Sequence, residues 1–161
     1  MLTSVLVTLI FNLKVDRTIE NKNYKLWVWD TAGQEKYRSI IKNYYRDSHG
    51  VLLMYDISDY KSFKSLDYYM KSLELIRDET IICLIGNKTD RDDRKISTME
   101  GLEYAKMNNI NLFFETSVKY NKNVTRSFEC MFEAIYEKKF KFEENTTILD
   151  RKIKENKNCV C

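Results

Sequence analysis

The stretch GVLLMYDI, residues 50–57, is a nearly continuous run of apolar residues. Such a run is typical of a strand that is buried on both faces of a parallel sheet. TIICLIGN at 80–87 and NLFFETS at 111–117 have the same character, and each predicts a further buried strand. YKLWVW at 24–29 alternates its side chains with the period of a strand, so a strand is predicted there as well.

Apolar residues at helical spacing lie between and after these strands, over 63–73, 98–108 and 124–135. Strands that alternate with helices indicate an α/β fold with a doubly wound, mostly parallel sheet that is covered on both faces. We expect one domain at residues 1–142. Residues 143–161 have little apolar periodicity, and we expect them to form a flexible tail.

The composition excludes several classes of protein. The 161 residues carry a formal net charge of only +3, which is too small for a nucleic-acid footprint, so no nucleic-acid partner is expected. Proline is absent and the four glycines are widely spaced, which excludes a glycine-rich phosphate loop. The apolar run at 2–11 has about half the length that a membrane-spanning helix needs. We therefore expect a soluble chain with at most a lipid anchor.

Polar residues follow the predicted strand at 24–29, in the sequence Asp30-Thr31-Ala32-Gly33-Gln34. An aspartate at a strand end can hold Mg²⁺, usually through water. Gly33 has no side chain, so its N–H can approach a phosphate oxygen. Gln34 can orient a water molecule for attack on a phosphate. Taken alone, this pattern is weak, and a plain turn would explain it in most proteins.

A second polar cluster, Asn87-Lys88-Thr89-Asp90, follows the strand at 80–87. The carboxylate of Asp90 can accept two hydrogen bonds from the N1–H and N2–H₂ edge of guanine, which adenine does not offer. The amide of Asn87 can support the loop and the outer edge of the base. The aliphatic part of Lys88 can lie along the face of the ring. A plain turn remains the alternative for this motif alone.

The third cluster, Ser117-Val118-Lys119, follows the strand at 111–117. A backbone N–H there, that of Val118, can donate to O6 of guanine, and Lys119 can cover the second face of the ring. A helix-capping serine is the alternative for this cluster alone. The three clusters occur in the order phosphate, base, base, each at the carboxyl end of a strand, where ligands bind in such sheets. Together they predict a guanine-nucleotide site.

These motifs resemble the Rab family of Ras-like small GTPases. The similar stretches are WDTAGQEKYRS, YYRDSHGVLLMYDIS, GNKTD and ETSVK, and the resemblance covers about residues 14 to 140. FKSLDYYMKSLE and MEGLEYAK are most similar to the subfamily numbered eighteen. The resemblance implies a P-loop NTPase fold of the Ras-like type and a GTP-binding switch in vesicle traffic, which hydrolyses GTP to GDP when complete.

The resemblance also implies cofactors, partners and residue roles. GTP or GDP and Mg²⁺ would be bound, and effectors, an exchange factor, a GAP, an escort protein and a GDP-dissociation inhibitor would be partners. Gln34 would be catalytic, and Thr8 would join Asp30 at the metal. Leu13, Trp29 and Tyr44 would form the aromatic surface that effectors read, although the family has a phenylalanine where this chain has Leu13.

The chain ends in Cys-Val-Cys behind the lysine-bearing stretch RKIKENKN. This ending does not fit the C-a-a-X prenylation rule. Two cysteines on a solvated tail nevertheless suggest lipid attachment, with an incidental tail as the alternative. The resemblance implies geranylgeranyl groups on both Cys159 and Cys161. It also implies a location on the cytoplasmic face of an intracellular membrane, with a cytosolic pool.

One feature of the family is missing from this sequence. No G-x-x-x-x-G-K-[ST] loop is present, because no two glycines stand five apart. The family's first strand, which precedes this loop, would lie between the strands at 24–29 and 50–57. Three hypotheses follow: an N-terminally incomplete Rab GTPase, a non-catalytic relative without the loop that acts as a binding module, and a compromised fragment. Whether this chain hydrolyses GTP by itself is left open.

Overall fold

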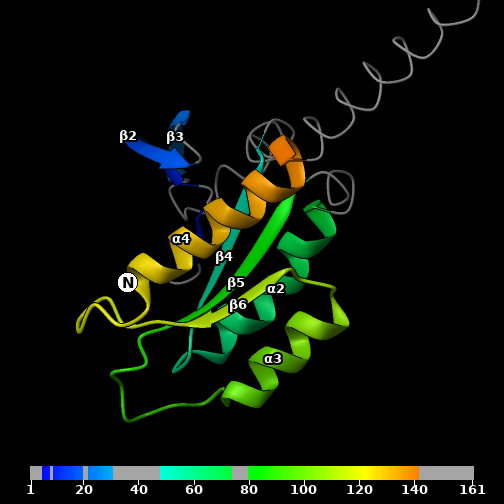
Figure 1. The fold of residues 1–161 in the computed structure, drawn as a ribbon. Helices are drawn as coiled ribbons and strands as arrows, with labels where there is room; N and C mark the ends of the chain where they lie inside the picture. The colour runs from blue at the N-terminus through cyan, green and yellow to red at the C-terminus, as the bar shows by residue number, and fades with distance from the viewer. Residues whose placement is uncertain (1–4, 8, 20–21, 31–47, 74–79, 142–161) are drawn as a thin grey trace, which may run out of the picture.

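The computed structural model describes residues 5–7, 9–19, 22–30, 48–73 and 80–141, and side chains only from residue 48 to residue 138 within these ranges. A helical turn of π type extends α4 over Tyr136–Lys141. The other elements, labelled in Figure 1, are β1 (Val5–Val7), β2 (Leu9–Ile19), β3 (Lys22–Asp30), β4 (Gly50–Asp56), α2 (Tyr60–Leu73), β5 (Ile81–Asn87), α3 (Thr98–Met107), β6 (Leu112–Glu115) and α4 (Val124–Ile135).

The central sheet has the strand order β1-β4-β5-β6. β4, β5 and β6 are parallel, with Gly50 opposite Ile81 and Cys83 opposite Leu112. The predicted α/β fold with a mostly parallel sheet is therefore confirmed. The expectation that the strand at 111–117 is buried is wrong, because β6 pairs with β5 alone among the described strands and all its residues are half-buried.

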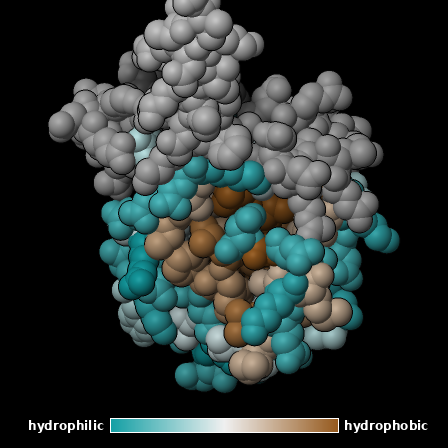
Figure 2. All heavy atoms as spheres, turned by 45° about the vertical axis from the view of Figure 1, so that its right-hand side comes forward, coloured by the Kyte–Doolittle hydropathy of each residue, from teal (hydrophilic) through white to brown (hydrophobic). Residues whose placement is uncertain are grey.

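Helices cover both faces of this sheet, and alternate residues of β4 and β5 contribute to the two cores. On one face Leu53 and Leu84 pack with α2 and with Ala105 of α3. On the other face Cys83 and Ile85 pack with Met131 of α4. Figure 2 shows one side of the molecule where hydrophobic residues lie at the centre of a hydrophilic surround.

Close approach of α3 to the sheet depends on two glycines beside Tyr55. A Cβ on Gly101 would collide with the Tyr55 hydroxyl and lie 2.9 Å from Cζ of Phe113. A Cβ on Gly86 would lie 2.8 Å from the same hydroxyl. The packing thus gives Gly101 a structural role. α3 begins at a capping box, in which Ser97 and Glu100 satisfy each other's backbone N–H groups.

The N-terminal strands are arranged differently from the expectation that all polar loops follow strands of one sheet. β2 and β3 form a separate antiparallel pair, with a bulge around Asn12. β1 pairs antiparallel with β4, and Leu6 lies opposite Leu53. Among the described strands β3 pairs with β2 alone, and β1 lies at the edge of β4 that faces away from β5. The edge of β4 is thus covered over a short length, and β3 is not part of the parallel sheet.

Candidate nucleotide-binding site

The two predicted base loops meet at one edge of the parallel sheet. β5 ends at Asn87 and its neighbour β6 ends at Glu115, so the residues that follow them emerge side by side. Backbone hydrogen bonds join the two loops: the Thr89 N–H donates to the Thr116 carbonyl at 3.1 Å, and the Thr116 N–H donates to the Gly86 carbonyl at 2.9 Å. The structure therefore brings the loops at 87–90 and 117–119 together.

Asp90 is held by the second loop. The Ser117 hydroxyl donates to Oδ1 of Asp90 at 2.6 Å, and Ser117 is only 1% exposed. This hydrogen bond holds the pKa of the Asp90 carboxyl below its usual range. No other described residue donates a hydrogen bond to its second oxygen, Oδ2. Asp90 thus presents an ionised, oriented carboxylate with an oxygen open to a ligand.

Asn87 braces the site from within the sheet edge. Its Oδ1 accepts a hydrogen bond from the Thr116 hydroxyl at 3.1 Å, and its backbone carbonyl accepts from the Ile57 N–H at 3.1 Å. Between Asn87 and Asp90, the Thr89 hydroxyl is buried with no partner among the described residues. A buried polar atom without a hydrogen-bond partner costs folding free energy, so the hydrogen-bonding capacity of this loop is not fully used in the structure.

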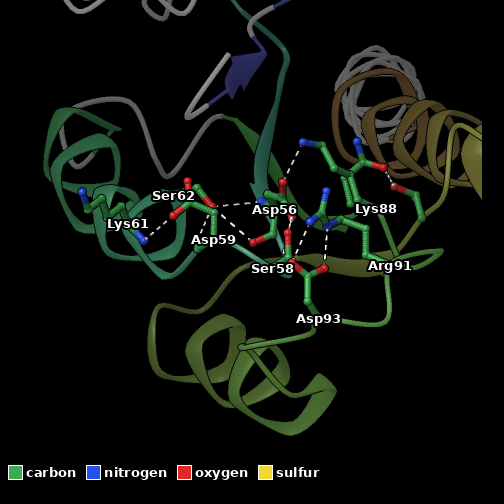
Figure 3. Close-up of polar contacts among 10 residues, drawn as sticks. Asp56, Ser58, Asp59, Lys61, Ser62, Lys88, Arg91 and Asp93 are labelled. Carbon is green, nitrogen blue, oxygen red and sulfur yellow. Dashed lines mark hydrogen bonds and ion pairs between the residues drawn. The ribbon is translucent and has the colours of Figure 1, made fainter. Parts of the chain in front are cut away.

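Lys88 has a left-handed backbone conformation, with a φ of 67°, that residues other than glycine rarely adopt. Its Nζ lies 2.6 Å from Oδ2 of Asp56, the last residue of β4 (Figure 3). The Lys88 carbonyl accepts a hydrogen bond from the Arg91 N–H at 3.0 Å, which closes the turn. Both the backbone and the ammonium of this lysine are therefore fixed.

Val118 and Lys119 lie on the exposed side of the second loop. Val118 is 66% exposed, and no described residue accepts a hydrogen bond from its N–H. Nζ of Lys119 lies 5.2 Å from the centre of the exposed Tyr120 ring. The loop closes where Ser117 and Lys122 exchange backbone hydrogen bonds of 3.2 and 2.9 Å. The N–H predicted to meet guanine O6 is thus available to a ligand.

Two braces of the site escaped the sequence analysis. The Arg94 guanidinium donates two hydrogen bonds to the Glu115 carboxylate, of 2.7 and 3.1 Å. These bonds connect the end of β6 to the loop before α3. The sequence offered no signal for Arg94. Asp56 is the second, and a carboxylate at the carboxyl end of a buried strand was a signal that could have been used.

The remaining predicted site residues are described only in part or not at all. Asp30 ends β3, and in the β2–β3 pair Leu13 lies opposite Val28 and Trp29 opposite Ile10, but only their backbones are described. These roles stay predictions. The predicted residues that lie outside the described ranges are Thr8, Gly33, Gln34, Tyr44, Cys159 and Cys161, and the tail at 143–161 lies outside them too.

Neither a metal cluster nor a membrane span is found in the part of the chain that the structure describes. The described residues hold no cluster of three or more histidine, cysteine, aspartate or glutamate side chains able to bind a metal ion. Within the same ranges no helix combines the length and the apolar character that crossing a membrane requires.

Residues 3–137 match the sequence model of the Ras family. The chain is 40% identical over 123 residues to the Ras-related protein Rab-18 of Lymnaea stagnalis, a match that covers 75% of this chain and 58% of that protein. It is 39% identical over 142 residues to Rab-11B of Dictyostelium discoideum, covering 87% of this chain and 64% of the relative. RabC of the same organism is 36% identical over 154 residues, which are 92% of this chain and 78% of RabC.

The chain thus spans about three fifths of the length of the first two of these curated relatives. The relatives carry several Rab names, so the similarity to subfamily eighteen remains a prediction. The family model covers most of the chain, including both base loops and the parallel sheet. This chain belongs to the Ras family of small GTPases, within its Rab branch.

Proposed function

We propose that the chain binds guanine nucleotides and that the loops at 87–90 and 117–119 hold the base. The observation that carries the proposal is the oriented carboxylate of Asp90, fixed by Ser117 at 2.6 Å. A carboxylate with both oxygens at the base can accept from N1–H and N2–H₂ of guanine. Adenine has no hydrogen on N1, so the carboxylate would lose the hydrogen bond that N1–H of guanine donates. The free N–H of Val118 adds a donor for guanine O6.

We also infer a GTP-dependent switch in vesicle traffic. GTP orders the switch segments, effectors bind the ordered form, and hydrolysis releases them. Gly33 would contact the γ-phosphate, and Gln34 would orient the attacking water. Asp30 and Thr8 would hold Mg²⁺, which supplies positive charge against the phosphate oxygens. Leu13, Trp29 and Tyr44 would meet effectors.

We further propose that Cys159 and Cys161 carry geranylgeranyl groups, since a single lipid chain binds membranes only reversibly. The basic residues of the tail would favour an anionic membrane surface. The domain at 1–142 would then work at the cytoplasmic face of an intracellular membrane. Mass spectrometry of the chain expressed in eukaryotic cells tests this point. Two free thiols at the C-terminus would contradict it.

A non-catalytic binding module is the second candidate. It is favoured by one observation, the lack of a G-x-x-x-x-G-K-[ST] loop in this sequence, because that loop supplies most phosphate contacts in the family. In this case the chain would bind effectors without turning over GTP.

Nucleotide analysis of the purified chain tests the proposal. The chain is first denatured, and any nucleotides that it releases are identified by ion-exchange chromatography. In a second experiment GDP and ADP are each titrated into the chain, and their dissociation constants are compared. GDP bound in preference to ADP supports guanine binding, and production of GDP from GTP would favour the switch over the binding module. Equal or undetectable binding of GDP and ADP at millimolar concentration would contradict the proposal.

A further inference from the structure

Asp56 stands beside the base loop without belonging to it. It is the last residue of β4 and lies opposite Asn87 in the parallel pairing of β4 with β5. Its side chain is 19% exposed, and that of Lys88 is 48% exposed. The pair therefore lies at the edge of the site, where both groups are partly shielded from water.

Both oxygens of the Asp56 carboxylate are engaged (Figure 3). Oδ1 accepts from the Ser58 N–H at 2.8 Å and from the Ser58 hydroxyl at 2.6 Å. Oδ2 pairs with Nζ of Lys88 at 2.6 Å. Burial alone would raise the pKa of Asp56, but the hydrogen bonds from Lys88 and Ser58 outweigh it and hold the pKa below its usual range. The carboxylate is thus a charged, fixed anchor.

The backbone around this anchor is also held. The Asp56 N–H donates to the Ser62 hydroxyl at 3.0 Å, and its carbonyl accepts from the Asp59 N–H at 3.0 Å. The next residue, Ile57, donates its N–H to the Asn87 carbonyl at 3.1 Å. Asp56 is therefore rigid relative to the base loop that contains Lys88.

A second ion pair in the same region makes a useful contrast. Arg91 and Asp93 are joined by two hydrogen bonds of 2.7 and 2.6 Å, but their side chains are 46% and 55% exposed. The two residues of this pair are only two positions apart in the sequence. Unlike the Asp56–Lys88 pair, it does not connect a lysine of the base loop to a strand of the sheet. It provides a control for the loss of one surface charge.

We propose that Asp56 is a positioning residue of the base site, which holds the Lys88 ammonium so that the lysine stem is ordered before the base arrives. The proposal rests on the proposed function, because it assigns Lys88 to the face of guanine. A free lysine side chain loses rotamer freedom when it is immobilised, and ordering it in advance removes that cost from binding. The inference is therefore that Asp56 contributes to guanine affinity without touching the nucleotide.

Asp56→Asn is the informative substitution. Its amide oxygen can still accept from Ser58, so the turn is retained, while the attraction for Lys88 is lost. Partly exposed ion pairs contribute modestly, so we expect about fivefold weaker GDP binding. Asp56→Glu keeps a carboxylate within reach of the lysine and is expected to recover most of the lost affinity. Asp93→Asn is the matched control and is expected to bind GDP like the unmodified chain.

GDP is titrated into the full chain of each variant to measure its affinity. Thermal unfolding of the same variants shows whether a loss of affinity reflects a loss of stability. In a Lys88→Met background, Asp56→Asn should have no further effect on the dissociation constant. The fivefold difference should also shrink in 1 M salt, since the tether is electrostatic.

Equal affinity of Asp56→Asn and the unmodified chain would overturn the inference while leaving guanine binding intact. A further fivefold loss in the Lys88→Met background, or a failure of Asp56→Glu to recover affinity, would do the same. Absence of GDP binding by the unmodified chain would instead overturn the proposed function, and the inference with it.

Discussion

In the sheet of β4, β5 and β6 the strands are packed between α2 and α3 on one face and α4 on the other. Among the described strands, β2 and β3 are paired only with each other. The first region carries both loops predicted to recognise the base. The second carries Asp30, where the loop predicted to meet the phosphates begins. The loops predicted to recognise the base and the loop predicted to recognise the phosphates therefore belong to regions of different construction.

The difference shows which predicted loops are supported by a packed core: those that follow the strands of the parallel sheet. Parallel strands order their carboxyl-terminal loops against each other, and the Thr89–Thr116 and Asp90–Ser117 hydrogen bonds do so here. A two-stranded antiparallel pair is at best marginally stable without further packing. We therefore expect the base loops to be ordered independently of the β2–β3 pair.

Asp90→Asn should break the base site most strongly. Loss of the carboxylate removes a charged acceptor, and the amide nitrogen would face the N–H₂ of guanine, so GDP affinity should fall on the order of 100-fold. Xanthosine diphosphate, which has a carbonyl in place of that amino group, should bind the variant better than GDP does. Titration calorimetry with both nucleotides measures this. A variant that still prefers GDP would contradict the assignment of Asp90.

Gly101→Ala is expected to have the second largest effect, a loss of stability in the core beneath the base loops. Its new Cβ would collide with the Tyr55 hydroxyl, and overpacking of this kind costs about 1–3 kcal/mol of unfolding free energy. Tyr55→Phe removes a buried hydroxyl that has no partner among the described residues, and should stabilise the chain by about 1 kcal/mol. Urea unfolding of both variants and of the double variant measures the effects. If Tyr55→Phe failed to relieve Gly101→Ala, this packing account would be wrong.

Hydrogen exchange sharpens the comparison of the two regions directly. Amides of β5, which has a parallel neighbour on each side, should exchange at least about tenfold more slowly than those of β2 and β3. Mass spectrometry of peptides from the two regions reports the rates. Equal protection in both would mean that the β2–β3 pair is packed as firmly as the parallel sheet.

The pH dependence of stability should show the smallest effect. The pKa of Asp56 is lower in the folded chain than its usual value, so the ionised carboxylate contributes stability above about pH 4, and this is lost as the pH falls through the folded value. Asp56→Asn should therefore lose less stability between pH 7 and pH 3.5 than the unmodified chain. Urea midpoints at the two pH values measure this, and equal losses would contradict the role of the Asp56–Lys88 pair.

Much of the parallel sheet could be predicted from sequence, because runs such as 50–57 and 80–87 combine apolar character with short length. β6 was misjudged because Leu112–Glu115 is as apolar as a central strand, and its edge position follows from strand order rather than from its own residues. The separate β2–β3 pair escaped prediction for a similar reason. Strand 24–29 was identified, but its partners depend on tertiary pairing.

The site could be predicted where a motif is local and could not where it is assembled from distant segments. Asn87 to Asp90 form one contiguous motif, so their proximity was certain once β5 was recognised. The bond between Ser117 and Asp90 required the loops of two neighbouring strands to meet, which parallel order made foreseeable. The grip of Arg94 on Glu115 joins a loop to a strand end without any spacing rule, and only the structure reveals it.

Backbone NMR of the full chain with added guanosine and, separately, adenosine tests the central claim that the base loops form a guanine site on the parallel sheet. The account predicts that guanosine shifts the amide signals of 88–90 and 117–119, that of Val118 foremost, and that adenosine leaves them in place. Equal shifts with both nucleosides, or guanosine shifts that lie elsewhere in the chain, would contradict it.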